Sequence, residues 1–263
     1  MDFIDVNGTA LRYELTGAGP HTVVLIHEMG GTLESFDGVA PRLARDRRVL
    51  RYDTRGAGLS EKVRGTLSID TMADDVVALL DALAVTGKVA LAGIAVGGAI
   101  ALHTAARHPA RVSAVVVGSP ATGIAAERRA GVLARADTIE REGMRAVAEE
   151  SFASGYPVEL RKDAAHFETF RTRWLGNDPA SYATIYRMLA NTDITDELAR
   201  IACPVLVLGG EFDRTRPPAL VEPIVRAIPN ARYAVVRTGH YMATITPDLV
   251  TAAIAVFLDE VGE

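Results

Sequence analysis

Short apolar runs alternate with segments of helical periodicity along most of the chain. The runs are too short for helices and rich in β-branched residues, as buried strands are, and they cover residues 23–27, 48–53, 89–94, 112–119, 205–210 and 233–237. Between them lie segments whose apolar residues recur at three- and four-residue intervals, over residues 68–83, 96–107, 217–227 and 247–258. This alternation predicts a largely parallel sheet that is covered by helices on both faces.

Two parts of the chain depart from the alternation. Residues 3–6 and 11–15 are strand-like runs joined across Asn7-Gly8, which predicts an antiparallel hairpin at the sheet edge and an eight-stranded, mostly parallel sheet. From residue 121 to about residue 194 the pattern changes to polar, Arg- and Glu-rich segments with helical periodicity and no convincing strand. We therefore expect a core formed by residues 1–120 and 195–263, with a helical cap, residues 121–194, inserted between its two parts.

Composition and charge exclude several classes of protein. Hydrophobic residues make up 49% of the chain and charged residues 23%, which is typical of a globular protein and not of a disordered one. The formal charge of −5 argues against a nucleic-acid partner. No apolar run is long enough to span a bilayer and the first residues lack a signal-peptide pattern, so we expect a cytoplasmic protein without a membrane partner. The sequence leaves the oligomeric state open.

Cofactor and anion sites have little support in the sequence. The single cysteine, Cys203, excludes an internal disulfide, and its place at the head of an apolar run predicts a buried thiol. The chain has no H-x-x-x-H pair, no C-x-x-C pair and no phosphate-binding glycine loop, so we expect neither a metal nor a nucleotide cofactor. Acidic and basic residues are nearly balanced in the expected cap, and an anion site there would need a local cluster of arginines.

A strand-to-helix junction carries the clearest chemical signal. The strand at residues 89–92 runs into Gly93-Ile94-Ala95-Val96-Gly97-Gly98, and a helix follows at once. This is the frame of a nucleophile elbow, G-x-S-x-G, with alanine in the place of the serine. Side chains at Gly93 and Gly97 would collide with neighbouring backbone in so tight a turn, and the central residue is strained. Taken alone, the stretch also fits an ordinary glycine-containing turn of a doubly wound fold.

Two further residues favour the elbow interpretation. Asp213 follows the strand at residues 205–210, and His240 follows the strand at residues 233–237. Both loops are expected at the carboxyl edge of the sheet, where open α/β sheets bind their ligands. The order along the chain, nucleophile position then acid then base, is that of an α/β hydrolase triad.

Together these motifs resemble the α/β-hydrolase family. The resemblance extends to the stretch at residues 25–31 and to the stretch at residues 52–60, whose Asp53 and Arg55 are expected to shape a loop. The length, the cap and segments such as residues 139–147 look most like the 3-oxoadipate enol-lactonase-like branch, which hydrolyses small lactones and esters in aromatic catabolism. Two features depart from the family pattern: Glu28 stands where glycine is more frequent, and residues 241–247 lack the acidic residue often found after the base.

The resemblance implies a role for each motif. A serine at position 95 would attack a carbonyl, His240 would accept and return its proton, and Asp213 would orient the imidazole. The backbone N–H groups of Met29 and Val96 would hold the oxyanion. The implied substrate is a small ester or lactone, and the implied chemistry requires no cofactor.

Several other residues are candidates for the substrate site. Glu28 and Tyr241 flank the implied machinery, and His166, Phe170 and Trp174 fall near one face of an expected cap helix, where packing within the cap is the alternative. We expect His27 to form a hydrogen bond within the oxyanion loop. We expect His103 and His108 to be packed or solvent-facing.

Two explanations account for Ala95. One is an engineered Ser→Ala change in an active enzyme, and the other is a natural loss of catalysis. A non-glycine residue with positive φ costs roughly 1 kcal/mol or more, so a chain released from catalysis would gain by changing to glycine there, which favours the first explanation. In either case we expect little or no covalent hydrolase activity from the chain as written. Two other functions stay open: a carbon–carbon bond hydrolase acting on a ring-cleavage product, and a natural non-catalytic binder of a small ligand.

Overall fold

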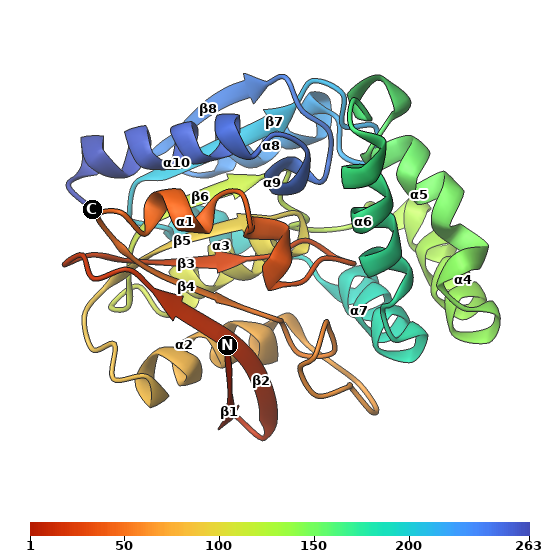
Figure 1. Cartoon of the computed structure of the whole chain (residues 1–263), viewed down its shortest axis with the longest axis horizontal. Coiled ribbons are helices and arrows are strands. Elements are labelled where there is room, and N and C mark those ends of the chain that lie inside the picture. The colour runs from red at the N-terminus through yellow and green to blue at the C-terminus, as the bar shows by residue number, and fades with distance from the viewer.

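The computed structural model describes residues 1–263 and contains one eight-stranded sheet in the order β1-β2-β4-β3-β5-β6-β7-β8 (Figure 1). Strands β3 to β8 are parallel, and β1 and β2 are antiparallel to their neighbours. The predicted mostly parallel sheet is therefore confirmed, with strand ends shifted by a residue or two. The strands are β1 (Asp2–Val6), β2 (Thr9–Thr16), β3 (Thr22–Ile26), β4 (Arg48–Tyr52), β5 (Val89–Ile94), β6 (Val112–Gly118), β7 (Val205–Gly210) and β8 (Ala231–Val236).

The N-terminal hairpin turns at Asn7 and Gly8, where φ is 48° and 71°. Positive φ at both central residues is what a two-residue hairpin turn requires, and asparagine and glycine tolerate it best. Val6 faces Thr9 in the register of the two strands. The predicted antiparallel hairpin is confirmed.

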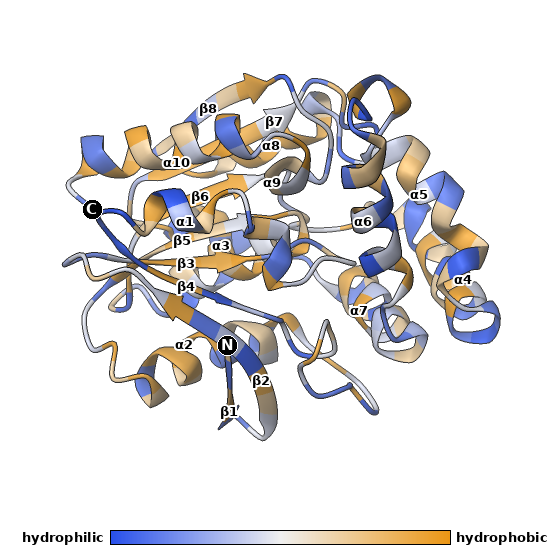
Figure 2. Cartoon of the chain, in the orientation of Figure 1, coloured by the Kyte–Doolittle hydropathy of each residue, from blue (hydrophilic) through white to orange (hydrophobic).

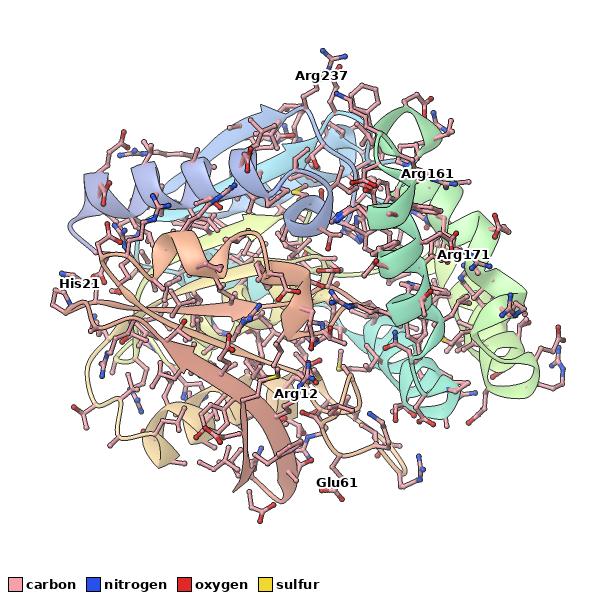
Figure 3. All side chains as sticks on the ribbon, in the orientation of Figure 1. Arg12, His21, Glu61, Arg161, Arg171 and Arg237 are labelled. Atoms are coloured by element: carbon pink, nitrogen blue, oxygen red, sulfur yellow. The ribbon has the colours of Figure 1, made fainter.

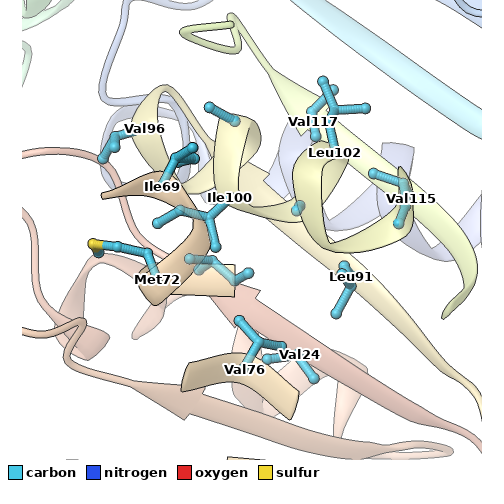
Figure 4. Close-up of a cluster of buried hydrophobic side chains, with 14 of the residues drawn as sticks. Val24, Ile69, Met72, Val76, Leu91, Val96, Ile100, Leu102, Val115 and Val117 are labelled. Carbon is cyan, nitrogen blue, oxygen red and sulfur yellow. The ribbon is translucent and has the colours of Figure 1, made fainter. Parts of the chain in front are cut away.

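Helices cover both faces of the sheet. One apolar cluster joins the strands to α2 (Ile69–Ala82), α3 (Val96–Arg107) and α8 (Pro218–Ala227), and Figure 4 shows part of it between α2, α3 and strands β3, β5 and β6. A second cluster joins the other face to α1 (Ala40–Leu43), α9 (Met242–Ile245) and α10 (Pro247–Val261). Burial on both faces explains why β3 after Thr22, and all of β5, are apolar instead of alternating.

Four helices between β6 and β7 form a layer at the carboxyl edge of the parallel strands (Figure 1). They are α4 (Ala126–Glu142), α5 (Ala148–Gly155), α6 (Ala164–Leu175) and α7 (Pro179–Asn191). A bridge between Gly123 and Asp193 brings the two ends of this insertion together. Short 3₁₀ segments complete the chain at η1 (Leu33–Phe36), η2 (Met144–Val147), η3 (Val158–Leu160) and η4 (Thr195–Arg200). We refer to α4–α7 as the cap.

Polar residues lie on the outside of both layers. Figure 2 shows apolar strands in the middle of the molecule and hydrophilic stretches on α4 and α6. In Figure 3, His21 lies at the end of the sheet away from the cap, whereas Arg171 lies on the cap itself. No helix in the chain is both long and apolar enough to cross a bilayer. Cys203 is half-buried, which is less than the predicted burial, because it lies two residues before the start of β7 and not within the strand.

Candidate active site

The turn between β5 and α3 holds Ala95 in an unusual backbone conformation. Its φ is 52° and its ψ is −112°, a region that non-glycine residues rarely adopt. A Cβ atom on Gly93 would overlap the backbone of Gly97, and a Cβ atom on Gly97 would overlap the carbonyl group of Ile26. The Ala95 N–H group donates to the carbonyl oxygen of Gly118 at 2.8 Å. The turn is therefore fixed by its glycines and its backbone, as the sequence predicts.

Asp213 and His240 meet beside this turn. His240 Nδ1 lies 2.8 Å from Asp213 Oδ2, and Asp213 Oδ1 accepts hydrogen bonds from the N–H groups of Thr215 at 2.9 Å and Arg216 at 2.8 Å. Asp213 is only 2% exposed. Burial disfavours its charged form, but His240 and the amide of Arg216 outweigh this, so the pKa of Asp213 lies below its ordinary value. The carboxylate thus stays ionised and holds Nδ1–H of the imidazole, which leaves Nε2 without a partner in the protein.

One cavity of about 340 Å³ collects these groups. Ala95, Val96, His240, Met29 and Tyr241 all contribute to its wall. The N–H groups of Met29 and Val96 donate no hydrogen bond within the protein, so both are available to an acceptor in the cavity. The residues expected at the nucleophile, base and oxyanion positions are therefore neighbours around a single space, with Asp213 buried behind His240.

The cap supplies the opposite wall. Its contributions come from α4, α5 and α7, and they are Arg128, Val132, Arg135, Glu150, Ser151, Ser154, Tyr182, Tyr186 and Leu189. Arg135 anchors this wall: it forms an ion pair with Glu150 and donates to Ser151 Oγ at 2.7 Å and to Tyr186 Oη at 3.2 Å. The sequence analysis did not identify these residues. The spacing of Arg128, Val132 and Arg135, four and then three residues apart, was the available signal, because it places them on one face of a helix.

Most of the expected substrate-binding residues lie elsewhere. Only Tyr241 lines the cavity, and this corrects the prediction for Glu28, His166, Phe170 and Trp174. Phe170 and Trp174 pack with Phe152 in the aromatic interior of the cap, at ring-centroid distances of 5.7 and 5.0 Å. Phe170 also packs on Tyr241 at 4.7 Å and Trp174 on Tyr182 at 5.6 Å, so both rings lie behind the cavity wall and not in it.

Two polar candidates also lie outside the cavity. Glu28 is 1% exposed beneath the oxyanion loop, where its Oε1 atom accepts from Ser35 Oγ at 2.8 Å. His166 is exposed, and its Nε2 atom lies 3.0 Å from the carbonyl oxygen of Thr244. Glu28 thus joins two buried segments and His166 joins two surface segments, and neither side chain lines the cavity.

The loop-shaping residues behave as expected. His27 Nδ1 lies 2.7 Å from the carbonyl oxygen of Glu28, and its Nε2 accepts from the N–H group of Thr54 at 3.0 Å. Asp53 accepts from the N–H groups of Leu33 at 2.8 Å and Leu59 at 2.7 Å, which ties the two loops flanking the oxyanion position to each other. These bonds fix the backbone that carries Met29.

The remaining histidines are structural. His103 is buried and contacts the carboxylates of Asp70 at 2.6 Å and Glu197 at 2.7 Å, so it links α2, α3 and η4. His108 lies 2.9 Å from Asp74. No group of three or more His, Cys, Asp or Glu side chains is arranged to hold a metal ion.

Comparison with known proteins agrees with this architecture. The sequence model of the family described as serine aminopeptidase, S33 (Hydrolase_4) matches residues 19–240. The chain is 28% identical to a putative carbamate hydrolase, RutD, of Azorhizobium caulinodans over 96% of each chain. It is 28% identical to 3-oxoadipate enol-lactonase 2 of Acinetobacter baylyi, over 81% of this chain and 79% of that protein.

Solved structures give the same result. A thermophilic esterase from Thermogutta terrifontis superposes with a TM-score of 0.93, at 29% identity and over 99% of each chain. The enol-lactonase from Burkholderia xenovorans superposes with a TM-score of 0.91, at 28% identity and over 98% of this chain and 100% of that one. The sheet, the flanking helices and the inserted cap therefore form an architecture shared with known hydrolases.

Proposed function

The chain belongs to the serine aminopeptidase S33 (Hydrolase_4) family of α/β hydrolases, and on this premise we propose that its cavity is an acyl-hydrolase site for a small ester or enol-lactone, with position 95 as the nucleophile position. One observation carries the proposal. Ala95, the imidazole of His240 backed by Asp213, and the unpaired N–H groups of Met29 and Val96 surround the same space.

The proposed reaction begins with a serine hydroxyl at position 95. Its Oγ attacks the substrate carbonyl carbon while His240 Nε2 takes the hydroxyl proton and Asp213 stabilises the imidazolium. The N–H groups of Met29 and Val96 hold the negative oxygen, an interaction worth about 3 to 4 kcal/mol per donor. The acyl–oxygen bond to the leaving group then breaks and the imidazolium protonates that oxygen. A water molecule then gives a proton to His240 Nε2 and attacks the acyl carbon. The bond to the serine oxygen breaks, and the imidazolium returns the proton to that oxygen.

The substrate class is supported by the cavity and by the relatives. A space of about 340 Å³ lies at the small end of the range of ligand sites, which suits a compact ester or lactone. Relatives that cover most of the chain include proteins named as an enol-lactonase, an esterase and a carbamate hydrolase. Cleavage of an acyl–heteroatom bond is common to all three names.

Alanine at position 95 removes the nucleophile, so the chain as written forms no acyl-enzyme in this proposal. We interpret Ala95 as a Ser→Ala replacement, because a φ of 52° costs energy that glycine at this position would not incur. A natural ligand-binding protein is the competing interpretation, and Ala95 itself is the observation in its favour. The codon at position 95 of the source gene separates the two: a serine codon excludes the natural binder.

The decisive experiment is the Ala95→Ser variant. We expect it to hydrolyse p-nitrophenyl acetate or an enol-lactone with a kcat on the order of 10⁴- to 10⁶-fold higher than that of the chain as written. This is the range by which the loss of a triad residue lowers kcat. The double variant Ala95→Ser/His240→Gln serves as the matched control and should return to background. Activity that survives in the double variant, or the absence of turnover on every acyl substrate, contradicts the proposal. A preference of Ala95→Ser for a vinylogous diketone over both esters would identify a carbon–carbon bond hydrolase.

A further inference from the structure

The cavity that holds Ala95 and His240 continues into a groove of about 380 Å³. Ile124, Arg128 and Arg216 line both spaces and so mark the junction between them. Arg216 comes from the loop that carries Asp213, and its own N–H group is bonded to that carboxylate at 2.8 Å. Arg128 comes from the first turn of α4 in the cap. Core and cap thus each place one guanidinium at the junction.

Four arginines line the cavity, and they fall into two pairs. Arg135 forms an ion pair with Glu150, and Arg214 forms one with Glu159 at 3.0 Å. The side chains of Arg128 and Arg216 form no ion pair and no hydrogen bond within the protein. The Nε atom of Arg216 is moreover buried without any partner. A buried charged donor left unpaired is costly, so an anion bound beside Arg216 would stabilise this end of the cavity.

No neighbouring carboxylate forms a direct ion pair with Arg128 or Arg216. Burial and the neighbouring Arg128 lower the pKa of Arg216, against the opposing effect of Asp213. Both oxygens of Asp213 are already engaged, by His240 and by backbone N–H groups. Glu127 and Asp193 line the groove but form no ion pair with either arginine. The junction therefore holds two guanidinium groups that form no direct ion pair with any carboxylate of the protein.

We propose that Arg128 and Arg216 bind a carboxylate of the ligand, so that the site takes acyl compounds that carry a second, ionised acid group. A planar guanidinium matches the two oxygens of a carboxylate, and such charge-assisted pairs are short and strong. The carbonyl to be attacked then lies toward Ala95 and the carboxylate toward the groove. The identity of the carbonyl end rests on the proposed function, whereas the anion site rests on the two arginines alone.

Direct binding to the chain as written tests this inference, because Ala95 leaves an ester intact. Monomethyl glutarate, a monoanion at pH 7, should bind at least about tenfold more tightly in calorimetry than uncharged dimethyl glutarate. Arg216→Gln and Arg128→Gln should each remove most of that preference. Arg129→Gln is the matched control, because it deletes the same charge one residue from Arg128, at an exposed side chain that bonds to Asn191 and lies outside the cavity.

The outcomes are separable. Equal affinity for the charged and the uncharged ester, an equal loss in Arg129→Gln, or binding of inorganic phosphate as tight as that of the half-ester overturns the carboxylate site. Arg128→Gln keeps the test valid if Arg216→Gln unfolds, since Arg128 is exposed on a helix. If Ala95→Ser hydrolyses the charged and the uncharged ester equally well, with or without Arg216→Gln, the anion site is overturned and the proposed function stands. If binding depends on Arg216 but Ala95→Ser hydrolyses nothing, the proposed function is overturned and the anion site stands.

Discussion

Asp213 holds the histidine of the candidate site, and the groups that hold it also make stability depend on pH. Because the pKa of Asp213 in the folded chain lies below the value of ~3.9 of an unperturbed aspartate, its contribution is present above about pH 4 and is lost as pH falls through the folded pKa. The variant Asp213→Asn should therefore lower the free energy of unfolding at pH 7 by about 2 kcal/mol, the scale of a hydrogen bond to a charged group. The difference should shrink as the pH falls through the folded pKa of Asp213.

Denaturant unfolding of both proteins at several pH values measures this effect. Asp5→Asn is the control, because Asp5 is exposed on β1 and forms no ion pair or side-chain hydrogen bond. It should change the free energy of unfolding by less than about 0.5 kcal/mol at any pH. A loss in Asp213→Asn that is the same at pH 7 and at low pH would show that the carboxylate acts through shape and not through charge.

At the scale of single residues, the sequence predicts that Asp213 and His240 lie close together, but it does not predict which side chains line the cavity. Asp213 and His240 follow strands of a parallel sheet, so topology alone brings them to one edge. Arg216 lies three residues beyond Asp213, yet a charged side chain in a loop looks the same whether it faces solvent or a cavity. Only the fold shows that its guanidinium has no partner.

Helix α4 contributes side chains to the cavity wall and packs against the rest of the cap, but much of its surface remains exposed. Arg128, Val132 and Arg135 point to the cavity, whereas Gly131 is exposed and a Cβ atom there would meet nothing within 4 Å. Gly131→Ala should therefore raise the free energy of unfolding by about 1 kcal/mol, because alanine is the better helix former. Thermal or denaturant unfolding checks the value.

The reverse change at Ala134, an exposed residue in the same helix, is the matched control. Ala134→Gly should destabilise the protein by a similar amount, about 1 kcal/mol. If both variants shift stability in the same direction, helix propensity does not govern α4.

Helix α6 shows the limit of periodicity as a guide. An apolar face at residues 166–174 has two possible partners, the substrate site and the rest of the cap, and both produce the same pattern. The aromatic ring of Phe152 in α5 occupies the space in front of this face. The prediction of a helix was correct, and the choice between partners needed the positions of α5 and α7.

For the whole molecule, stability is expected to be uneven between the core and the cap. Ten of the twelve residues of α3 are buried, whereas α4 has two buried residues, Ala136 and Ile139, among seventeen. Local opening follows regions with few buried apolar contacts. Amide hydrogen exchange should therefore be at least about tenfold faster in α4 than in α3. Equal protection in the two helices would contradict this, and ligand binding in the cavity should slow exchange in α4 selectively.

The architecture as a whole follows closely from the pattern of the chain. Strands buried on both faces form mainly apolar runs, so β3, β5, β6 and β7 are visible without any structure. Residues 121–194 differ because a layer lying on one edge of the sheet needs only narrow apolar faces. The order in which the strands pair is the part that periodicity leaves open, and only the structure gives it.

The turn at Ala95 is shaped by clearances at Gly93 and Gly97 and by a main-chain bond to Gly118, none of which involves the methyl group. Every alanine codon becomes a serine codon when its first base changes from G to T. A single-nucleotide mutation would thus deliver an oxygen atom to a backbone already bent to present it. The alanine-containing and serine-containing forms of this protein are thus one nucleotide apart, and the change from one to the other requires no rearrangement of the turn.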